Sequence, residues 1–140
     1  MHHWLVAAGI YNLAWGAAAI VAPVSMIRLL GVRTTGTDLW PQLWACIGMI
    51  VGVYGVGYII AAGDPARHWP IVLVGLLGKV LGPIGFLNAA MHGQLPWSMG
   101  LVNLTNDLLW WVPFALILRY AARSARLAAA RDRNASGSAD

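Results

Sequence analysis

Residues 69–91 read WPIVLVGLLGKVLGPIGFLNAAM, and this stretch decides the fold. It carries one charge, Lys79, and almost all its other residues are apolar, with no polar loop segment between them. A helix that crosses a bilayer needs about 20 predominantly apolar residues. Backbone groups inside lipid must also be paired within their own segment, which favours a helix. We therefore predict that residues 69–91 form a transmembrane helix.

Three further runs have the same character, at residues 4–22, 39–62 and 97–118. They are too long and too continuous for the alternating strands of a membrane barrel. The first run follows His2 and His3 rather than lysine or arginine, and its apolar core exceeds that of a signal peptide, so we expect an uncleaved span. The sequence thus predicts an all-α bundle of four transmembrane helices within residues 1–122. A basic juxtamembrane segment and a disordered tail are expected in residues 123–140.

The composition agrees with a bilayer as the solvent of this chain. Hydrophobic residues make up 59% of the chain and charged residues 10%, whereas soluble domains carry about 25% charged residues. The net charge of +4 is concentrated near the C-terminus. We interpret that basic segment as a contact for anionic lipid head groups at Arg119, Arg123 and Arg126, and not as a nucleic-acid site. Because basic segments stay in the cytoplasm, the C-terminus is predicted to be cytoplasmic. Four spans return the chain to the same side, so the N-terminus is predicted to be cytoplasmic too.

Lys79 is the only lysine and lies near the middle of its predicted helix. A charge at the centre of a bilayer costs about 2.5–3.5 kcal/mol and usually has a partner. Helix rise places Lys79 about 15 Å and Asp107 about 18 Å from the same membrane edge. We therefore predict an intramembrane pair between Lys79 and Asp107. Two interpretations remain open: the pair sets helix register, or it lines a cavity and responds to a proton, an ion or a ligand.

Other polar and aromatic residues extend this candidate site. Asn103, Asn106 and Asp107 share one helical stripe with Trp110, because they are spaced three and four residues apart. Asn12 lies in the first span. These asparagines either hydrogen-bond between helices or hold a ligand. The candidate intramembrane site therefore consists of Lys79, Asp107, Asn103, Asn106, Asn12 and Trp110, with an aromatic pocket or core formed by Trp15, Trp111, Tyr11, Tyr54, Tyr58 and Phe86.

Small residues recur on one face of three predicted helices. The stripes are Gly9 and Gly16 in the first, Gly48, Gly52 and Gly55 in the second, and Gly75, Gly78, Gly82 and Gly85 in the third. Small residues let helices approach closely in lipid, so we expect close packing at these stripes.

The sequence offers no recognisable cofactor, metal or catalytic constellation. His68 and His92 are predicted at opposite membrane edges, so they cannot share a metal. The single Cys46 cannot form an internal disulfide or a zinc site, and we expect it to be a small buried hydrophobe. The segment GLLGKV does not match the spacing of a phosphate-binding loop. We therefore predict no cofactor, no metal and no catalytic residue.

Four segments resemble a family of small bacterial four-helix membrane proteins. They are GIYNLAWG, GMIVGVYGVGY, HWPIVLVGLLGKVLGPIGF and NDLLWWVPFALIL, within residues 9–118. The resemblance implies the four-helix architecture and a multi-pass location in the bacterial inner membrane. Some members of that family are labelled alkyl hydroperoxide reductases. We do not transfer this activity, because it requires a reactive, accessible thiolate and Cys46 lies in an apolar span.

Three functions remain as expectations. The first is a non-enzymatic protein that binds or moves a small solute, proton or amphiphile at Lys79 and Asp107. The second is a structural or accessory subunit whose charge pair and glycine stripes serve packing, and self-association fits so small a bundle. The third is a membrane enzyme on a lipid-like substrate, with Asp107 as acid or base. A water-filled cavity would favour the binding or transport function. A dry charge pair with an exposed glycine face would favour the structural role, and a pocket open sideways to lipid would favour the enzyme.

Overall fold

The computed structural model describes residues 1–137 and contains only helices and connecting segments in that range. Four stretches are long and apolar enough to cross a membrane, which confirms the expected fold class at that level. The helices are α1 (His2–Val21), α2 (Pro23–Leu29), α3 (Trp40–Gly63), α4 (Trp69–Met91), the 3₁₀ turn η1 (Trp97–Met99), α5 (Gly100–Asn103), the π-helix η2 (Leu104–Leu108) and α6 (Leu109–Gly137).

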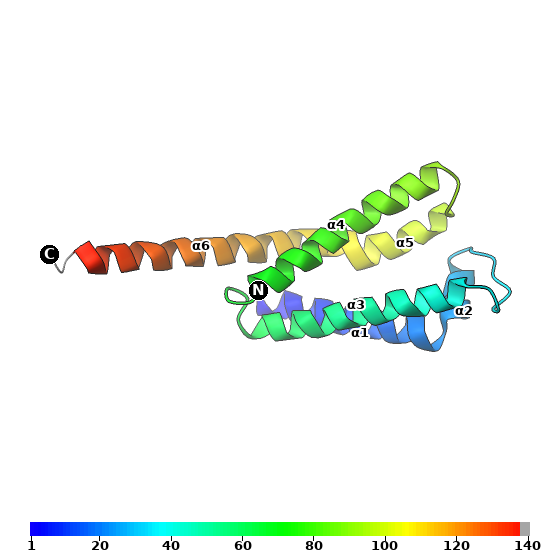
Figure 1. The fold of residues 1–140 in the computed structure, drawn as a ribbon, viewed down its shortest axis with the longest axis horizontal. Coiled ribbons are helices and arrows are strands. Elements are labelled where there is room, and N and C mark those ends of the chain that lie inside the picture. The colour runs from blue at the N-terminus through cyan, green and yellow to red at the C-terminus, as the bar shows by residue number, and fades with distance from the viewer. Residues whose placement is uncertain (138–140) are drawn as a thin grey trace.

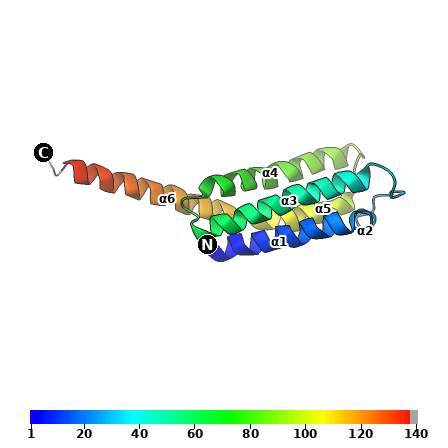
Figure 2. The same cartoon turned by 60° about the horizontal axis from the view of Figure 1, so that its bottom comes forward.

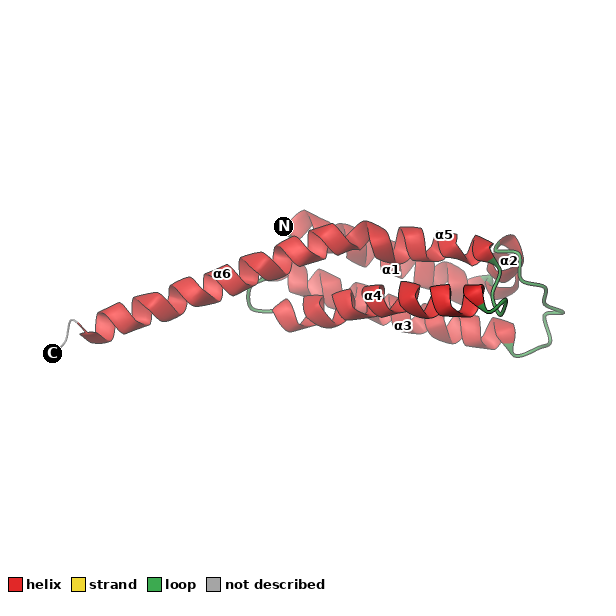
Figure 3. Ribbon diagram, turned by 90° about the horizontal axis from the view of Figure 1, so that it is seen from above, coloured by secondary structure: helices red, strands yellow, loops and turns green. Residues whose placement is uncertain are grey.

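The long helices run antiparallel and side by side (Figures 1 and 2). One end of the bundle, which we call the His2 end, holds the start of α1 and the loop at residues 64–68. The other, the α2 end, holds α2 and the loop at residues 92–96 (Figure 3). Toward the α2 end, α4 and α5 diverge from α1 and α3 (Figure 1). The bundle therefore consists of two layers, α1 with α3 and α4 with α5, η2 and α6.

The C-terminal part of the chain differs from the prediction. Helix α6 continues through the arginine-rich segment to Gly137 and projects beyond the His2 end (Figure 1). Within the segment where a disordered tail is expected, residues 134–137 belong to this helix, and residues 138–140 lie outside the described part. Alanine and arginine dominate this segment, and their high helix propensity explains why the helix does not end at the last apolar turn.

Glycines bring α1 and α3 into backbone contact. A Cβ atom added to Gly16 would lie 2.5 Å from the carbonyl oxygen of Gly48, and one added to Gly9 would lie 2.9 Å from that of Gly55. Real side chains do not tolerate such distances, so glycine is required at these positions. The predicted close packing is therefore confirmed for the first layer.

The glycine stripe of α4 behaves differently. A Cβ atom added to Gly75 would clash with the ring of Tyr58, whereas Gly78 and Gly85 have open space there, so the expected close packing is wrong at these two positions. Gly52 of α3 has open space at its own Cβ position, but its backbone nitrogen would lie 3.1 Å from a Cβ atom added to Gly16, so it belongs to the close contact with α1. Cys46 also departs from its expectation, since it is exposed on the surface of α3 rather than buried.

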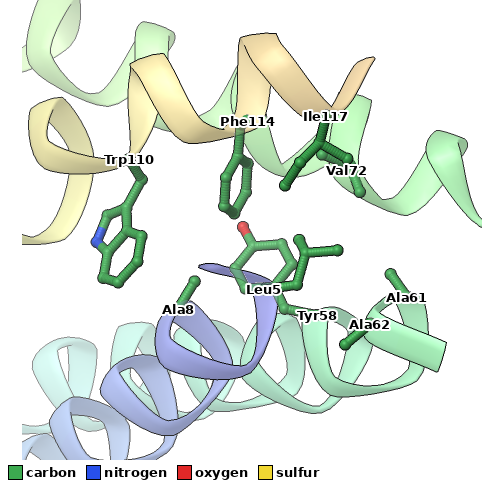
Figure 4. Packing of buried hydrophobic residues seen from close by; sticks show 9 residues of the cluster. All are labelled: Leu5, Ala8, Tyr58, Ala61, Ala62, Val72, Trp110, Phe114 and Ile117. Carbon is green, nitrogen blue, oxygen red and sulfur yellow. The ribbon is translucent and has the colours of Figure 1, made fainter. Parts of the chain in front are cut away.

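Two apolar clusters hold the layers together. The larger lies at the His2 end, where the ring of Tyr58 packs edge-on against Phe114 with ring centroids 4.9 Å apart. Figure 4 shows its members on α1, α3, α4 and α6: Leu5, Ala8, Tyr58, Ala61, Ala62, Val72, Trp110, Phe114 and Ile117. The smaller cluster consists of Ala19, Ile27 and Trp44 and anchors α2 against α1 and α3. The space between the two clusters remains incompletely filled.

Candidate functional site

A cavity of about 430 Å³ lies between the two layers. Five of the six residues that the sequence proposed for an intramembrane site line it, namely Asn12, Lys79, Asn103, Asn106 and Asp107. The sixth, Trp110, does not. It is 5% exposed, belongs to the apolar cluster at the His2 end and packs against Phe114. The structure therefore brings the predicted polar residues together and assigns Trp110 to the core.

Lys79 links α4 to η2 and α6, because it donates one hydrogen bond and accepts another. Its ammonium group donates to the backbone carbonyl of Asn106, and its own backbone carbonyl accepts a hydrogen bond from Nε1 of Trp111 at 3.0 Å. That carbonyl is available because Pro83, four residues further on, has no N–H to donate to it. The indole of Trp111 thus replaces the helical hydrogen bond that the proline removes.

The π-helix η2 supplies the acceptors on the other side. A π-turn shifts the hydrogen-bond register by one residue, which leaves a backbone carbonyl without its usual i+4 partner. Two carbonyls in η2 accept side-chain donors: that of Thr105 accepts Nε1 of Trp110 at 3.1 Å, and that of Asn106 accepts Lys79. The π-turn therefore makes backbone carbonyl groups of η2 available as hydrogen-bond acceptors in the site.

The predicted contact between Lys79 and Asp107 is indirect. The Asp107 side chain is buried, and its carboxylate accepts a hydrogen bond from Nδ2 of Asn106 at 3.2 Å. No hydrogen bond joins it to Lys79 within residues 1–137. Asn106 connects the two charges instead, because its backbone carbonyl binds the lysine and its side chain binds the aspartate. The second carboxylate oxygen, Oδ2, lies toward Gly82 of α4, where an added Cβ atom would be 3.4 Å away.

Three buried polar atoms around the cavity have no hydrogen-bond partner. They are Oδ1 of Asn12, Oδ1 of Asn106 and Nε1 of Trp44, and no other buried nitrogen or oxygen is unpartnered among the side chains that the structure describes. All three residues line the cavity. Unpartnered buried polar groups are uncommon in native proteins and cost about 1–3 kcal/mol each. These atoms have almost no accessible surface, so they lie within the cavity wall and do not face the cavity itself.

Aromatic side chains form much of the remaining wall. Trp15, Tyr54, Tyr58 and Phe86, which the sequence had proposed for an aromatic pocket, all line the cavity. Trp44 also lines it, and sequence reasoning missed that residue. Its spacing from Gly48, Val51, Gly55 and Tyr58, alternately four and three residues along α3, was the signal that places it on the same helical face.

A second, apolar groove adjoins the cavity. It has a volume of about 390 Å³, lies between α3 and α4 and shares Tyr54 with the cavity. Its other lining residues are Val53, Gly57, Pro70, Ile71 and Val74. The cavity, which contains the charged and amide side chains, and the apolar groove therefore share one lining residue, Tyr54.

The cavity brings together hydrogen-bonding and charged side chains from several helices. Among the side chains that the structure describes, no three from His, Cys, Asp or Glu come together as a metal site. The cavity instead presents one ammonium group, one carboxylate and several amide and indole groups within an aromatic wall. Such a combination can bind a molecule that is partly polar and partly apolar.

No protein-family model, curated protein or solved structure matches the chain. The resemblance to small bacterial four-helix membrane proteins therefore stays a prediction.

Proposed function

We propose that this chain is a multi-pass protein of the bacterial inner membrane with both termini in the cytoplasm. Four sufficiently long apolar helices support a multi-pass arrangement. The exposed arginines of α6, which follow the fourth apolar stretch, support a cytoplasmic His2 end through the positive-inside rule. Reporter fusions at the C-terminus test the orientation: fluorescent protein should be active there and alkaline phosphatase inactive. The reverse result would refute it.

The proposed activity is binding or movement of a small polar or amphipathic molecule in the cavity. The observation that carries this proposal is that five polar or charged residues line one cavity, namely Asn12, Lys79, Asn103, Asn106 and Asp107. Ionisable side chains inside a membrane bundle are costly and usually mark a functional site. A molecule with hydrogen-bonding groups would match these lining residues.

Cysteine labelling tests whether the cavity admits polar molecules. In a Cys46→Ser background, Val102→Cys places a thiol on the cavity wall, and Leu101→Cys places one on the adjacent exposed surface. N-ethylmaleimide is uncharged and crosses the bilayer, so it should label Val102→Cys in intact membranes and leave Leu101→Cys, which faces lipid and cannot form a thiolate there, unlabelled. Equal and negligible labelling of both would refute a solvated binding cavity.

A structural role is the second candidate, and the reciprocal hydrogen bonds of Lys79 favour it. This lysine joins α4 to η2 and α6 through Asn106 and Trp111. The test is a cycle of Lys79→Met, Asp107→Asn and the double variant, scored by membrane abundance and thermal stability in detergent. If each single change destabilises and the double change recovers, the charges serve folding. If all three variants are as stable as the parent, the charges serve the ligand.

The third function, an enzyme acting on a lipid-like substrate, is favoured by one observation. The cavity is lined by residues that are also exposed on the surface of α3 and α4, among them Ile50 and Gly82. Asp107 would then act as acid or base. Incubation of the purified protein with candidate lipids and mass spectrometry of the products tests this: a product whose formation stops in Asp107→Asn would support it, and no product would refute it.

The basic segment provides a separate proposal for a membrane partner. Arg119, Arg123 and Arg126 are exposed on one face of α6, just beyond the apolar cluster at the His2 end. Anionic head groups would lie at this depth and attract them. Replacing all three with glutamine should weaken retention of phosphatidylglycerol relative to phosphatidylcholine during purification. Unchanged retention would refute the contact.

A further inference from the structure

We propose that the cavity and the adjoining groove form one site for a single-chain amphiphile with a neutral, hydroxyl-bearing head group. The molecule enters sideways from the bilayer between α3 and α4, the head binds in the cavity and the chain lies in the groove. This inference rests on the proposed binding function and names its ligand class and route.

The continuity of the two spaces supports an amphiphile. The cavity contains Lys79 and Gly78 of α4, and the groove begins at Val74, one turn closer to the His2 end. The groove extends along α4 to Pro70, which is about 14 Å from Lys79 at the helical rise. The cavity is lined by charged and amide side chains together with apolar ones, whereas the groove is lined by aliphatic side chains, Gly57, Pro70 and Tyr54. One molecule with a polar and an apolar part fits this division.

The exposed members of the lining give the route. Ile47 and Ile50 of α3 are 45% and 58% exposed although they line the cavity. Across from them, Gly78 has no neighbour within 4 Å of an added Cβ atom. A side-chain-free strip on α4 thus faces a partly exposed strip on α3. In a bilayer this opening faces acyl chains, so a lipid-soluble molecule reaches the cavity without passing through either end of the bundle.

The polar lining residues of the cavity select the head group. The carboxylate of Asp107 accepts hydrogen bonds, the ammonium group of Lys79 donates them, and the amide of Asn103 can do both. A hydroxyl group also donates and accepts, so a head group with two or more hydroxyls matches both kinds of lining group. The site's own charges, Lys79 and Asp107, already balance. A charged head group would add an uncompensated charge at this depth, which is unfavourable in a membrane.

The test uses a monoacylglycerol with a diazirine in its chain, added to the protein in lipid nanodiscs. After illumination, mass spectrometry should locate crosslinks within residues 53–57 and 70–74, the segments of the groove. Unlabelled monododecanoylglycerol should compete for these crosslinks. Dodecanoate, with the same chain length and an anionic head, should compete about tenfold more weakly, since one ordinary hydrogen bond corresponds to about tenfold in affinity.

Matched variants separate the head site from the groove. Val74→Trp fills the groove at a partly exposed position and should abolish the crosslinks, whereas Leu81→Trp, on the same helix but outside both spaces, should leave them unchanged. Asn12→Leu should weaken competition by monododecanoylglycerol about tenfold. The difference in competing strength between monododecanoylglycerol and dodecanoate should become smaller.

Crosslinks that do not saturate, or that spread evenly over exposed surfaces, would overturn the inference. So would equal competition by the two lipids. If the thiol at position 102 is labelled by N-ethylmaleimide while the monoacylglycerol fails, the binding function stands and only this ligand class is wrong. If that thiol is also unlabelled, the proposed binding function itself fails.

Discussion

The indole of Trp111 replaces a hydrogen bond that Pro83 removes, and this relation is open to a quantitative test. Nε1 of Trp111 donates to the backbone carbonyl of Lys79 at 3.0 Å. In an uninterrupted helix that carbonyl would accept the N–H of residue 83, but proline has none. We predict that Trp111→Phe destabilises the protein and that Pro83→Ala makes it tolerant of the same change.

The expected magnitude follows from the environment of the bond. Leaving a buried acceptor unpaired costs about 1–3 kcal/mol in proteins generally. Hydrogen bonds between membrane helices average about 0.6 and reach about 1.7 kcal/mol. Trp111 is 37% exposed, so the ring area lost on changing to Phe adds little. We therefore expect Trp111→Phe to lower the free energy of unfolding by about 1 kcal/mol.

The assay is a double-mutant cycle measured by reversible unfolding in sodium dodecyl sulfate. In the Pro83→Ala background, the backbone N–H restored at position 83 pairs with the Lys79 carbonyl, so Trp111→Phe should cost only about a few tenths of a kcal/mol there. Trp4→Phe, at an exposed tryptophan in the first turn of α1, is the control and should be close to neutral. Equal costs of Trp111→Phe in both backgrounds would refute the reasoning.

Three further outcomes follow from other parts of the structure. Gly16→Ala should destabilise by about 1–3 kcal/mol because its Cβ would meet the backbone of α3, while Gly85→Ala, with open space around it, should be neutral or stabilising. Thermal unfolding in detergent compares the two, and a loss at both positions would contradict the packing argument. The pKa of Asp38 is lowered chiefly by the hydroxyl of Thr34, which donates at 2.7 Å, so the loop gains stability above the ordinary carboxyl pKa and loses it as pH falls through the lowered value. Thr34→Val should raise that pKa toward 3.8, and an unchanged NMR titration would count against the hydrogen bond. Cys46→Leu should change the free energy of unfolding by no more than about 0.5 kcal/mol, because the thiol is exposed, and a larger loss would show that it is packed.

The sequence was sufficient for the number and approximate bounds of the four apolar helices. Length and apolar composition are properties of one segment, and satisfaction of backbone hydrogen bonds in lipid makes each such segment a helix on its own. Depth could also be predicted, because helical rise is constant. The arrival of Lys79, Asn106 and Asp107 at one cavity follows from this arithmetic and from the antiparallel order of α4 and α6.

What the sequence could not decide was the identity of the contacts at that depth. Lys79 binds the backbone of Asn106, not the carboxylate of Asp107, because the π-turn in η2 leaves carbonyl groups free to accept it. No residue type in the sequence predicts that shift of hydrogen-bond register. Composition likewise did not predict that α6 would continue beyond the bundle.

The division between packed and open glycines was also a matter of tertiary structure. Gly16 and Gly78 look alike in sequence, yet one touches a neighbouring backbone and the other faces open space. In water, burial of the apolar face would distinguish them. In lipid the surroundings are as apolar as a helix surface, so hydrophobicity does not select which face packs. Only the fit between the helices does, and that fit places Trp110 in the core, leaves Gly78 beside the cavity and produces the site.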